Sequence, residues 1–378
     1  MKVLHVFTLL TTASFFDGQF QYLGENGIDI SVASNAIAED DFCQRNSIRH
    51  IHIPITRTIN PLADLKAIYR LVRIIRKNKF DVVFGHTPKG AMISMIAAKL
   101  AGTKHRVYYR HGLIYTTSKG IKHLIFKFIE KLTSSCASKI INVSPSLGEL
   151  AIKDHLNHRK KQLVIGPGTC GGIDTIKLFN PKLIDNNRLN DLRRQLSIKS
   201  TDYIIGFCGR LCRDKGIIEL IDAFRTFKKN GHDEAKLLLI GRYDSRDILP
   251  DHIKQNIQNS NDIIHTGLVN HNELPYYYSL MNVFVFPSYR EGFGMSVIEA
   301  SSMNVPVLVS RSHGCIDAIK EGVSGEYIEI TAKSISEKLS ELKNNRHTYN
   351  TVSRKFVTDN FEQTDLWPSI LQFYNQLK

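Results

Sequence analysis

Short runs of β-branched and aromatic residues alternate with longer helical patterns along the whole chain, and this alternation restricts the fold more than any other feature. Strands that alternate with helices predict parallel sheets covered by helices on both faces. The pattern forms two series, so we expect an α/β protein with two Rossmann-like domains whose strand ends face each other across a cleft. The expected strands are residues 2–10, 29–34, 48–53, 82–84, 106–109, 139–143 and 163–165, then 203–207, 236–240, 263–265, 283–286, 305–309 and 326–328, with helices such as 62–78, 217–230 and 296–303 between them.

Four glycines and a proline interrupt the pattern at residues 166–172, which predicts the seam between the two domains. The segment has the form of the dinucleotide fingerprint GxGxxG, but no helical pattern follows it directly, and this favours a hinge. We therefore expect domains over residues 1–170 and 171–355. Trp367 and Pro368 interrupt the helical pattern of residues 356–378, which predicts a broken C-terminal helix that packs back on the first domain.

The positive charge of the chain is concentrated in its first half. The formal net charge of +14 divides into +13 for residues 1–180 and +1 for residues 181–378. This predicts an anionic partner for the first half: nucleic acid, phospholipid or a phosphorylated small molecule. The apolar start of the chain predicts a buried strand rather than a signal peptide, and no stretch approaches the roughly 20 apolar residues of a membrane span. The six cysteines form no CxxC pair, which favours reduced thiols over a zinc site.

The strongest motif is PSYREGFGMSVIE at residues 287–299, directly after an expected strand. It carries Glu291 to a glycine-rich turn, and a helix that begins near Ser296 places Glu299 in its first turn. Glycines let the backbone approach a ligand closely, and the N–H groups at a helix start favour an anion such as diphosphate. Ser296 and Glu299 also match a capping box, so this motif alone leaves a purely structural alternative open.

A second motif, GRLCRDKG at residues 209–216, also lies between an expected strand and a helix. Arg210 can grip a diphosphate through its planar guanidinium, and Lys215 adds a point charge. The structural alternative is an exposed pair neutralised by Asp214. Two anion sites at strand ends of one domain favour binding. The chain contains no Walker A sequence and no DxD metal clamp.

These two segments resemble the signature motifs of retaining glycosyltransferases of family 4, which have the GT-B architecture of two Rossmann-like domains. The likeness rests on Gly-Arg-Leu followed by Lys-Gly, and on two glutamates eight positions apart. It extends over nearly the whole chain, because residues 86–90, 109–113, 142–146 and 171–174 resemble a bacterial branch that builds capsule, O-antigen and related surface polysaccharides.

The resemblance implies a role for each matching residue. Arg210 and Lys215 would hold the donor diphosphate, and Glu299 the ribose hydroxyls. Glu291 would contact hydroxyls of the donor sugar, and His111 would lie near the reacting centre, so these two are the implied catalytic residues. The other implied donor contacts are Gly209, Gly292, Phe293, Gly294, Met295 and Ser296, with Gly241 and Leu268 beside the base.

The acceptor contacts come from the first half. His86 and His111 both follow expected strands at the carboxyl edge, and the alternative for each is a structural histidine. Thr87 and Pro88 predict a helix start, which places Lys89 where it can cradle an acceptor phosphate. Many family members have a glycine pair after the first strand, whereas here only Gly18 lies further on. His86, Lys89 and Gly18 are the predicted acceptor residues.

Two basic helical patterns account for much of the charge in the first half. In residues 62–79, Lys66, Arg70, Arg73 and Lys77 form a stripe opposite the expected apolar positions Leu65, Ile68, Val72 and Ile75. In residues 119–131, Lys119, Lys122, Lys127 and Lys131 lie among Ile121, Leu124, Ile125 and Phe128. Each pattern alone fits a core helix with a solvated face, but with the charge of +13 both favour docking on anionic lipid.

Together these features predict a cytoplasmic enzyme at the inner face of the cell membrane. It would move a hexose or N-acetylhexosamine from a UDP-type sugar to a lipid-diphosphate-linked saccharide, with retention and without metal or another cofactor. Two other enzyme classes stay open, a GT-B nucleotide-sugar epimerase and a phosphorylase. A nucleic-acid-binding protein is disfavoured because the basic patches lack interleaved aromatic residues and recognised binding motifs.

Overall fold

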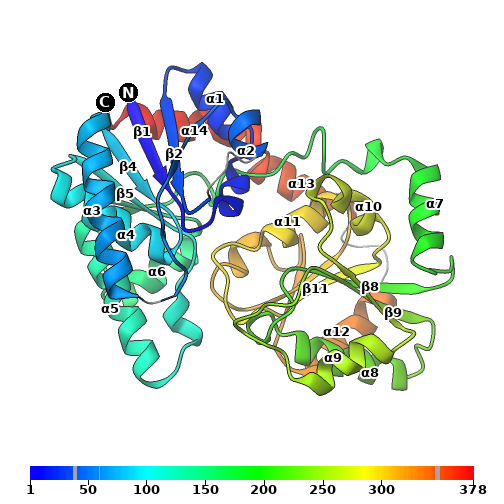
Figure 1. The fold of residues 1–378 in the computed structure, drawn as a ribbon. Coiled ribbons are helices and arrows are strands. Elements are labelled where there is room, and N and C mark those ends of the chain that lie inside the picture. Colours follow the sequence, from blue (N-terminus) through cyan, green and yellow to red (C-terminus); the bar gives the residue numbers. More distant parts are fainter. Residues whose placement is uncertain (37–40, 59, 345–349) are drawn as a thin grey trace. The chain divides into compact units, whose positions relative to one another are not determined.

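The computed structural model describes residues 1–36, 41–58, 60–344 and 350–378, and it divides into two compact units (Figure 1). Unit 1 comprises Met1–Gly172 together with Gln363–Lys378, and unit 2 comprises Ile173–Glu362. Both are α/β units with one parallel sheet each, as the alternation predicts. All thirteen expected strands are present, with ends that differ by a few residues.

Unit 1 contains a seven-stranded parallel sheet in the order β3-β2-β1-β4-β5-β6-β7. Its strands are β1 (Lys2–Val6), β2 (Asp29–Ser34), β3 (Arg49–His52), β4 (Val82–Gly85), β5 (His105–Arg110), β6 (Lys139–Asn142) and β7 (Gln162–Leu163). Its helices are α1 (Gln19–Glu25), α2 (Asp41–Arg45), α3 (Pro61–Asn78), α4 (Pro88–Ala101), α5 (Gly120–Cys136), α6 (Pro145–Lys153) and α14 (Gln363–Asn375). The first strand is shorter than expected, because residues Leu10–Phe16 form a 3-10 helix.

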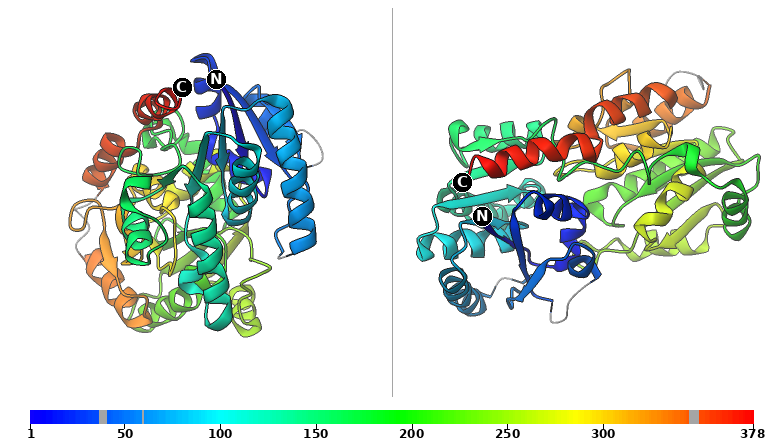
Figure 2. Two further views of the ribbon diagram at one scale, coloured as in Figure 1. Left: turned by 90° about the vertical axis from the view of Figure 1, so that its left-hand side faces the viewer. Right: turned by 90° about the horizontal axis from the view of Figure 1, so that it is seen from above.

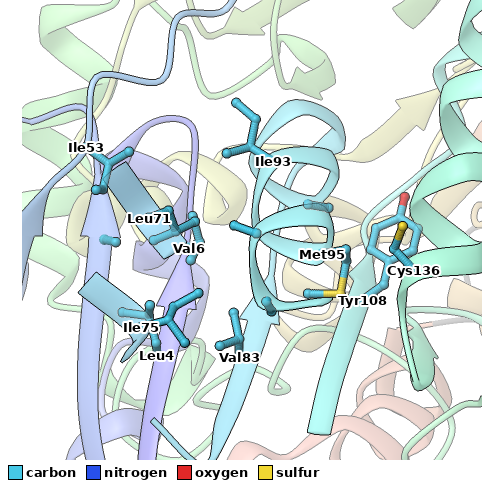
Figure 3. Packing of buried hydrophobic residues seen from close by; sticks show 14 of the residues in the cluster. Leu4, Val6, Ile53, Leu71, Ile75, Val83, Ile93, Met95, Tyr108 and Cys136 are labelled. Atoms are coloured by element: carbon cyan, nitrogen blue, oxygen red, sulfur yellow. The ribbon is translucent and has the colours of Figure 1, made fainter. Parts of the chain in front are cut away.

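The two faces of the sheet in unit 1 differ in chemistry because alternate strand residues point to opposite sides. On one face, aliphatic side chains of the strands pack against α3 and α4 (Figure 3). Leu4 and Val6 of β1 belong to this cluster, whereas His5 between them faces the other side and stacks on Phe84 and His86. That second face is aromatic, and it is covered in part by α14 through Tyr374.

One predicted apolar position of α3 is wrong. Leu65 is 63% exposed, and the side chains that α3 buries are Asp64, Ala67, Leu71 and Ile75. The apolar stripe is therefore rotated toward Asp64 and Ala67, because the carboxylate of Asp64 has an ion-pair partner in Lys89 that allows its burial. The four predicted basic residues of α3 are all exposed.

Unit 2 contains a six-stranded parallel sheet in the order β10-β9-β8-β11-β12-β13. Its strands are β8 (Tyr203–Cys208), β9 (Ala235–Ile240), β10 (Ile263–Gly267), β11 (Val283–Phe286), β12 (Val307–Ser310) and β13 (Glu326–Ile328). Its helices are α7 (Asn186–Gln195), α8 (Ile217–Lys229), α9 (Asp251–Asn259), α10 (Leu274–Ser279), α11 (Met295–Ser302), α12 (Ala332–Asn344) and α13 (Asn350–Phe361).

Each sheet reverses its strand order once. In unit 2 the chain runs outward from β8 to β10 and then returns to place β11 on the other side of β8. In unit 1 the same reversal lies between β1 and β4. Loops that leave the carboxyl ends of two such strands diverge, and ligands of open α/β sheets bind there. The loops after β8 and β11 in unit 2, and after β1 and β4 in unit 1, are therefore the expected ligand-binding positions.

The C-terminal segment is broken as expected, but at another residue. The break lies at Glu362, between α13 and α14, whereas Pro368 lies inside α14. The Glu362 carboxylate accepts a hydrogen bond from the backbone N–H of Thr175 at 2.9 Å, and this contact fixes the point at which the chain leaves unit 2. The following helix belongs to unit 1, where Trp367 Nε1 donates to the carbonyl of Gly171 at 3.1 Å and both chain ends lie (Figure 2).

Candidate functional site

The loops after β8 and β11 touch at the point where the strand order of unit 2 reverses. Gly216 has a φ of 68°, and a Cβ atom there would lie 2.1 Å from the carbonyl oxygen of Pro287. Only glycine allows this approach at a positive φ. The backbone N–H of Tyr289 also donates to the carbonyl of Asp214 at 2.9 Å. The two predicted motifs, which are 70 residues apart in the sequence, therefore form one continuous edge within unit 2.

Two cations of this edge are held by carboxylates. Lys215 forms an ion pair with Glu291, and their side chains are only 11% and 13% exposed. Arg210 forms an ion pair with Asp244, a buried carboxylate that the sequence analysis did not identify. Burial opposes ionisation of Asp244, but hydrogen bonds from the backbone of Arg246, from Arg210 and from the backbone of Asp247 lower its pKa to about 2. Both positive charges are therefore fixed before any ligand arrives.

Helix α11 begins one residue earlier than predicted, and this rules out the capping-box interpretation. Its N-cap residue is Gly294 and its first residue is Met295, so Glu299 is the fifth helical residue and lies beyond the first turn. The Glu299 carboxylate instead accepts a hydrogen bond from the buried Tyr278 hydroxyl at 2.8 Å and lies 3.4 Å from His271 Nε2. The glutamate is therefore held by tertiary contacts, with the start of α11 nearby.

Backbone hydrogen bonds of glycines connect the carboxyl ends of β8, β9 and β10. The N–H of Gly209 donates to the carbonyl of Ile240 at 2.9 Å, and the N–H of Gly241 donates to that of Gly267 at 2.8 Å. A Cβ atom on Gly241 would lie 2.0 Å from the Gly209 carbonyl oxygen, so the loops can meet only without side chains. Leu268 extends from this edge and is 77% exposed.

At the corresponding edge of unit 1, Thr8 contacts the start of α4. Thr87 is the N-cap residue of α4 and Pro88 the first helical residue, as predicted, but the Thr87 side chain does not cap the helix. The Thr8 hydroxyl, which follows β1, accepts the hydrogen bond from Gly90 N at 3.0 Å and lies 2.7 Å from Thr87 Oγ1. A residue distant in sequence thus caps α4.

Of the predicted acceptor residues, Lys89 and Gly18 have structural contacts. Lys89 Nζ lies 2.8 Å from Asp64 Oδ1 and 3.2 Å from Thr56 Oγ1, so its charge is already balanced. Gly18 begins α1 with a φ of 72°, and a Cβ atom there would lie 3.1 Å from Trp367.

The predicted histidines lie together at the carboxyl edge of unit 1. His86 follows β4, His111 follows β5, and His86 Nδ1 lies 3.0 Å from His111 Nε2. Two neighbours were not identified from the sequence: His5 in β1 and Cys170, whose Sγ lies 3.3 Å from His111 Nδ1. No local pattern could have indicated them, because each reaches the cluster from a distant part of the chain.

Family comparisons match both units. Residues 190–356 match the model of the glycosyl transferases group 1, and residues 5–144 match that of the glycosyl transferase 4-like family. The chain is 32% identical over 379 aligned residues to the capsular polysaccharide biosynthesis glycosyltransferase CapM of Staphylococcus aureus, and the match covers 99% of this chain and 97% of the relative. The chain belongs to the family 4 glycosyltransferases. Its fold is accordingly GT-B.

A more distant relative agrees with this assignment, and two solved structures agree with the fold. A UDP-Gal:alpha-D-GlcNAc-diphosphoundecaprenol alpha-1,3-galactosyltransferase of Escherichia coli is 26% identical, covering 82% of this chain and 79% of that protein. Among solved structures, a glycosyltransferase of Rickettsia africae is similar with a TM-score of 0.80 at 20% identity, covering 100% of this chain and 98% of that one. Alr3699/HepE of Anabaena, solved with UDP and glucose, has a TM-score of 0.81 at 17% identity, with 99% of each chain covered.

Three further observations concern cofactors and membranes. All six cysteines are free thiols. Within the described residues, no group of three or more histidine, cysteine or carboxylate side chains is arranged to hold a metal ion. No helix in the same part of the chain is long and apolar enough to cross a bilayer.

Proposed function

We propose that this glycosyltransferase retains the anomeric configuration as it moves a hexose or N-acetylhexosamine from a UDP-sugar to a lipid-diphosphate-linked saccharide of a capsule or O-antigen. The observation that carries this proposal is the pair of fixed cations at the reversal point of unit 2, Arg210 paired with Asp244 and Lys215 paired with Glu291. The relatives support the substrate classes, because the Escherichia coli protein is named for UDP-Gal and a diphosphoundecaprenol acceptor.

The ion pairs of unit 2 suggest how a donor is received. A diphosphate that approaches Lys215 competes with Glu291 for its ammonium group. If the diphosphate takes over this contact, the Glu291 carboxylate becomes available to accept hydrogen bonds from the donor sugar. Arg210 is 40% exposed and can add a second contact while it stays paired with Asp244. Glu299, oriented by Tyr278, is proposed to hold the ribose hydroxyls.

The same charges supply the chemistry that bond cleavage needs. As the glycosidic bond to the diphosphate breaks, negative charge grows on the departing phosphate, and we propose that Arg210, Lys215 and the N–H groups at the start of α11 stabilise it. We propose that no metal is required for this step. A front-face route, in which the leaving phosphate helps to accept the proton of the incoming hydroxyl, fits retention. The name of a Campylobacter jejuni relative gives an alpha-1,3 product on a diphospho-undecaprenol acceptor.

The acceptor is assigned to unit 1, with Lys89 and Gly18 as its proposed contacts and His111 as the residue nearest the reacting centre. The predicted contact His86 is fully buried and both its ring nitrogens face other histidines, so it is not proposed to touch the acceptor. Thr8 and Thr87 close the start of α4, where Lys89 lies. An acceptor phosphate there has to compete with Asp64 for Lys89. Replacing Lys89 by alanine is expected to raise the KM for the acceptor, and an unchanged acceptor KM contradicts its role.

Membrane docking is proposed for the outer surface of α3 and α5. In α5 the side chains of Ile121, Leu124, Ile125 and Phe128 are between 41% and 70% exposed, and their spacing places them on one stripe. Lysines flank this stripe, and α3 adds four exposed cations. Each basic residue near an anionic surface contributes about 1 kcal/mol, and the apolar stripe would enter the headgroup boundary. The enzyme would thus work on the inner face of the cell membrane.

Vesicle flotation tests this docking. Binding is expected to rise with the fraction of anionic lipid and to fall strongly for the double variant Leu124→Asp/Phe128→Asp. Leu183→Asp is the matched control, because Leu183 lies in unit 2 and is 56% exposed, close to the 62% of Leu124 and the 66% of Phe128. Binding that does not depend on anionic lipid, or that both variants weaken equally, contradicts the proposal.

The transfer itself is tested with purified full-length protein, UDP-sugars and undecaprenyl-diphosphate-linked N-acetylglucosamine. An α-linked product from an α-linked donor, formed equally well in excess EDTA, is the expected result. A β-linked product contradicts retention, and loss of activity in EDTA contradicts metal independence. UDP-sugar incubated alone separates the epimerase alternative, because an isomerised nucleotide sugar would favour it. The family assignment favours the enzyme over the nucleic-acid-binding alternative.

A further inference from the structure

Three histidines of unit 1, the buried His5 and His86 and the partly exposed His111, form one continuous hydrogen-bonded chain. His5 Nδ1 lies 2.8 Å from His86 Nε2, and His86 Nδ1 lies 3.0 Å from His111 Nε2. The chain has a tyrosine at one end, where the Tyr374 hydroxyl of α14 lies 3.0 Å from His5 Nε2. At the other end, Cys170 Sγ lies 3.3 Å from His111 Nδ1.

This geometry uses both ring nitrogens of every histidine. A neutral imidazole has one N–H donor and one acceptor nitrogen, and each contact between two rings needs a single proton. The chain can therefore exist in two orientations only. If the Tyr374 hydroxyl donates to His5, all three rings carry their proton on Nδ1. If the Cys170 thiol donates to His111, all three carry it on Nε2. Any mixture leaves two N–H groups or two lone pairs facing each other.

The rings are neutral in the folded protein. Burial lowers the pKa of His5 to about 3 and that of His111 to about 4, and burial together with the neighbouring histidines lowers the pKa of His86 well below its ordinary value. The surroundings are aromatic: Phe7 and Tyr109 stack on His86, and Phe84 stacks on His5. Among the residues that the structure describes, the hydrogen-bond partners of the three rings are each other, Tyr374 and Cys170, so the two ends determine the orientation of the hydrogen-bonded chain.

We propose that Tyr374, His5 and His86 are positioning residues that hold His111 in the Nδ1–H tautomer. A tyrosine hydroxyl is a stronger hydrogen-bond donor than a cysteine thiol, so the chain is oriented from Tyr374 toward Cys170. His111 then presents a donor at Nδ1, and its contact to Cys170 at 3.3 Å is the weakest link and the one that a substrate hydroxyl or phosphate oxygen can replace. His111 would thus act as a hydrogen-bond donor and not as a base.

This proposal rests on the proposed function insofar as His111 contacts the substrate, but its main test does not need a substrate. Two-bond proton–nitrogen correlation spectra of the full chain, labelled with ¹⁵N-histidine, distinguish the two tautomers directly. The expected result is a set of three Nδ1–H rings that do not titrate between pH 5.5 and 8. An Nε2–H tautomer at His111 overturns the proposal.

Variants of Tyr374 and Cys170, at the two ends of the hydrogen-bonded histidine chain, test whether these residues determine the tautomer of His111. Tyr374→Phe removes the donor and is expected to shift His111 toward Nε2–H. Cys170→Ser places a stronger donor at the opposite end and is expected to act in the same direction. Tyr108→Phe is the matched control, because Tyr108 and Tyr374 are both 2% exposed, yet the Tyr108 hydroxyl donates to Glu130 and not to a histidine. If Tyr374→Phe leaves the His111 tautomer unchanged, as Tyr108→Phe is expected to do, the proposal is wrong.

A kinetic readout separates this proposal from the proposed function. Tyr374→Phe is expected to lower kcat by about tenfold or more while the donor KM stays nearly constant, because a donor aimed at the transition state is lost and ground-state binding is not. If the tautomers change as expected but the protein transfers no sugar, the orientation of the histidine chain is supported and the proposed function is contradicted. A normal kcat in a variant whose His111 has changed tautomer contradicts a catalytic role for that tautomer.

Discussion

The two units place different chemistry at equivalent points of similar sheets. In unit 2 the reversal point between β8 and β11 carries paired charges, and both members of the Lys215–Glu291 pair are nearly buried. In unit 1 the reversal point between β1 and β4 carries a neutral, aromatic cluster around His5, His86 and His111. Fixed charge suits a diphosphate, whereas a neutral cluster controls protons and hydrogen-bond direction. Two sheets of similar topology can thus carry charged side chains at one reversal point and neutral, aromatic ones at the other.

The pH dependence of stability separates the two edges most strongly. The folded pKa values of His5 and His111 are about 3 and about 4, below the ordinary 6.5, so the unfolded chain binds more protons as the pH falls below 6.5. Unit 1 should lose about 2 kcal/mol per buried histidine between pH 7 and pH 5. The chain has one tryptophan, Trp367 in unit 1, so urea unfolding followed by its fluorescence measures this loss. A free energy that is constant over this range contradicts buried neutral histidines.

Breaking the Lys215–Glu291 pair should damage unit 2 in both function and stability. Lys215→Met leaves a nearly buried carboxylate unpaired, which is expected to cost about 3 kcal/mol of unfolding free energy. Activity should fall about a hundredfold or more through loss of charge at the leaving group. The double variant Lys215→Met/Glu291→Gln should regain most of the stability but none of the activity. Circular dichroism during urea unfolding and initial rates measure both. Equal stability of the single and double variants would show that the pair is not coupled.

The packing of Gly90 tests how the neutral edge of unit 1 is built. A Cβ atom there would lie 2.9 Å from Thr87 Oγ1 and 3.0 Å from the Thr8 nitrogen, so Gly90→Ala should cost about 2 kcal/mol. Gly24→Ala in α1 is the control, because no atom lies within 4 Å of its Cβ position, and it should be neutral or stabilise by up to about 1 kcal/mol. Trp367 fluorescence reports both. Two equal changes would contradict the close contact of Thr8 with α4.

Glu299 should produce the smallest of these effects. Glu299→Gln keeps an oxygen that can accept the Tyr278 hydrogen bond but removes the charge, so UDP should bind about tenfold more weakly while the fold persists. Titration calorimetry with UDP measures the change, and Glu130→Gln in unit 1 is a control that should not alter UDP affinity, since Glu130 is bonded to Tyr108. Unchanged affinity in Glu299→Gln contradicts the ribose contact.

The difference between the edges also explains what the sequence could predict. The strands and helices follow from hydrophobic periodicity. Most predicted donor-binding residues of unit 2 lie in two short motifs, so their positions in the sequence indicate their positions in the fold. Details that depend on tertiary contacts could not be predicted. Thr8 caps α4 in place of Thr87, Asp64 replaces Leu65 on the buried face of α3, and α11 starts at Met295, so that Glu299 does not cap it. The histidine chain joins strands and loops that no local pattern connects.

Donor binding by the paired cations of unit 2 is tested most directly by a thermal-shift panel of UDP-, GDP- and ADP-sugars that compares the wild type with an Arg210→Ala/Lys215→Met variant. Binding to the folded state raises the melting temperature by mass action. We predict a rise with UDP-sugars that the variant loses. A wild type that no nucleotide sugar stabilises, or a variant that is stabilised as much as the wild type, would contradict the claim that the paired cations of unit 2 bind the donor.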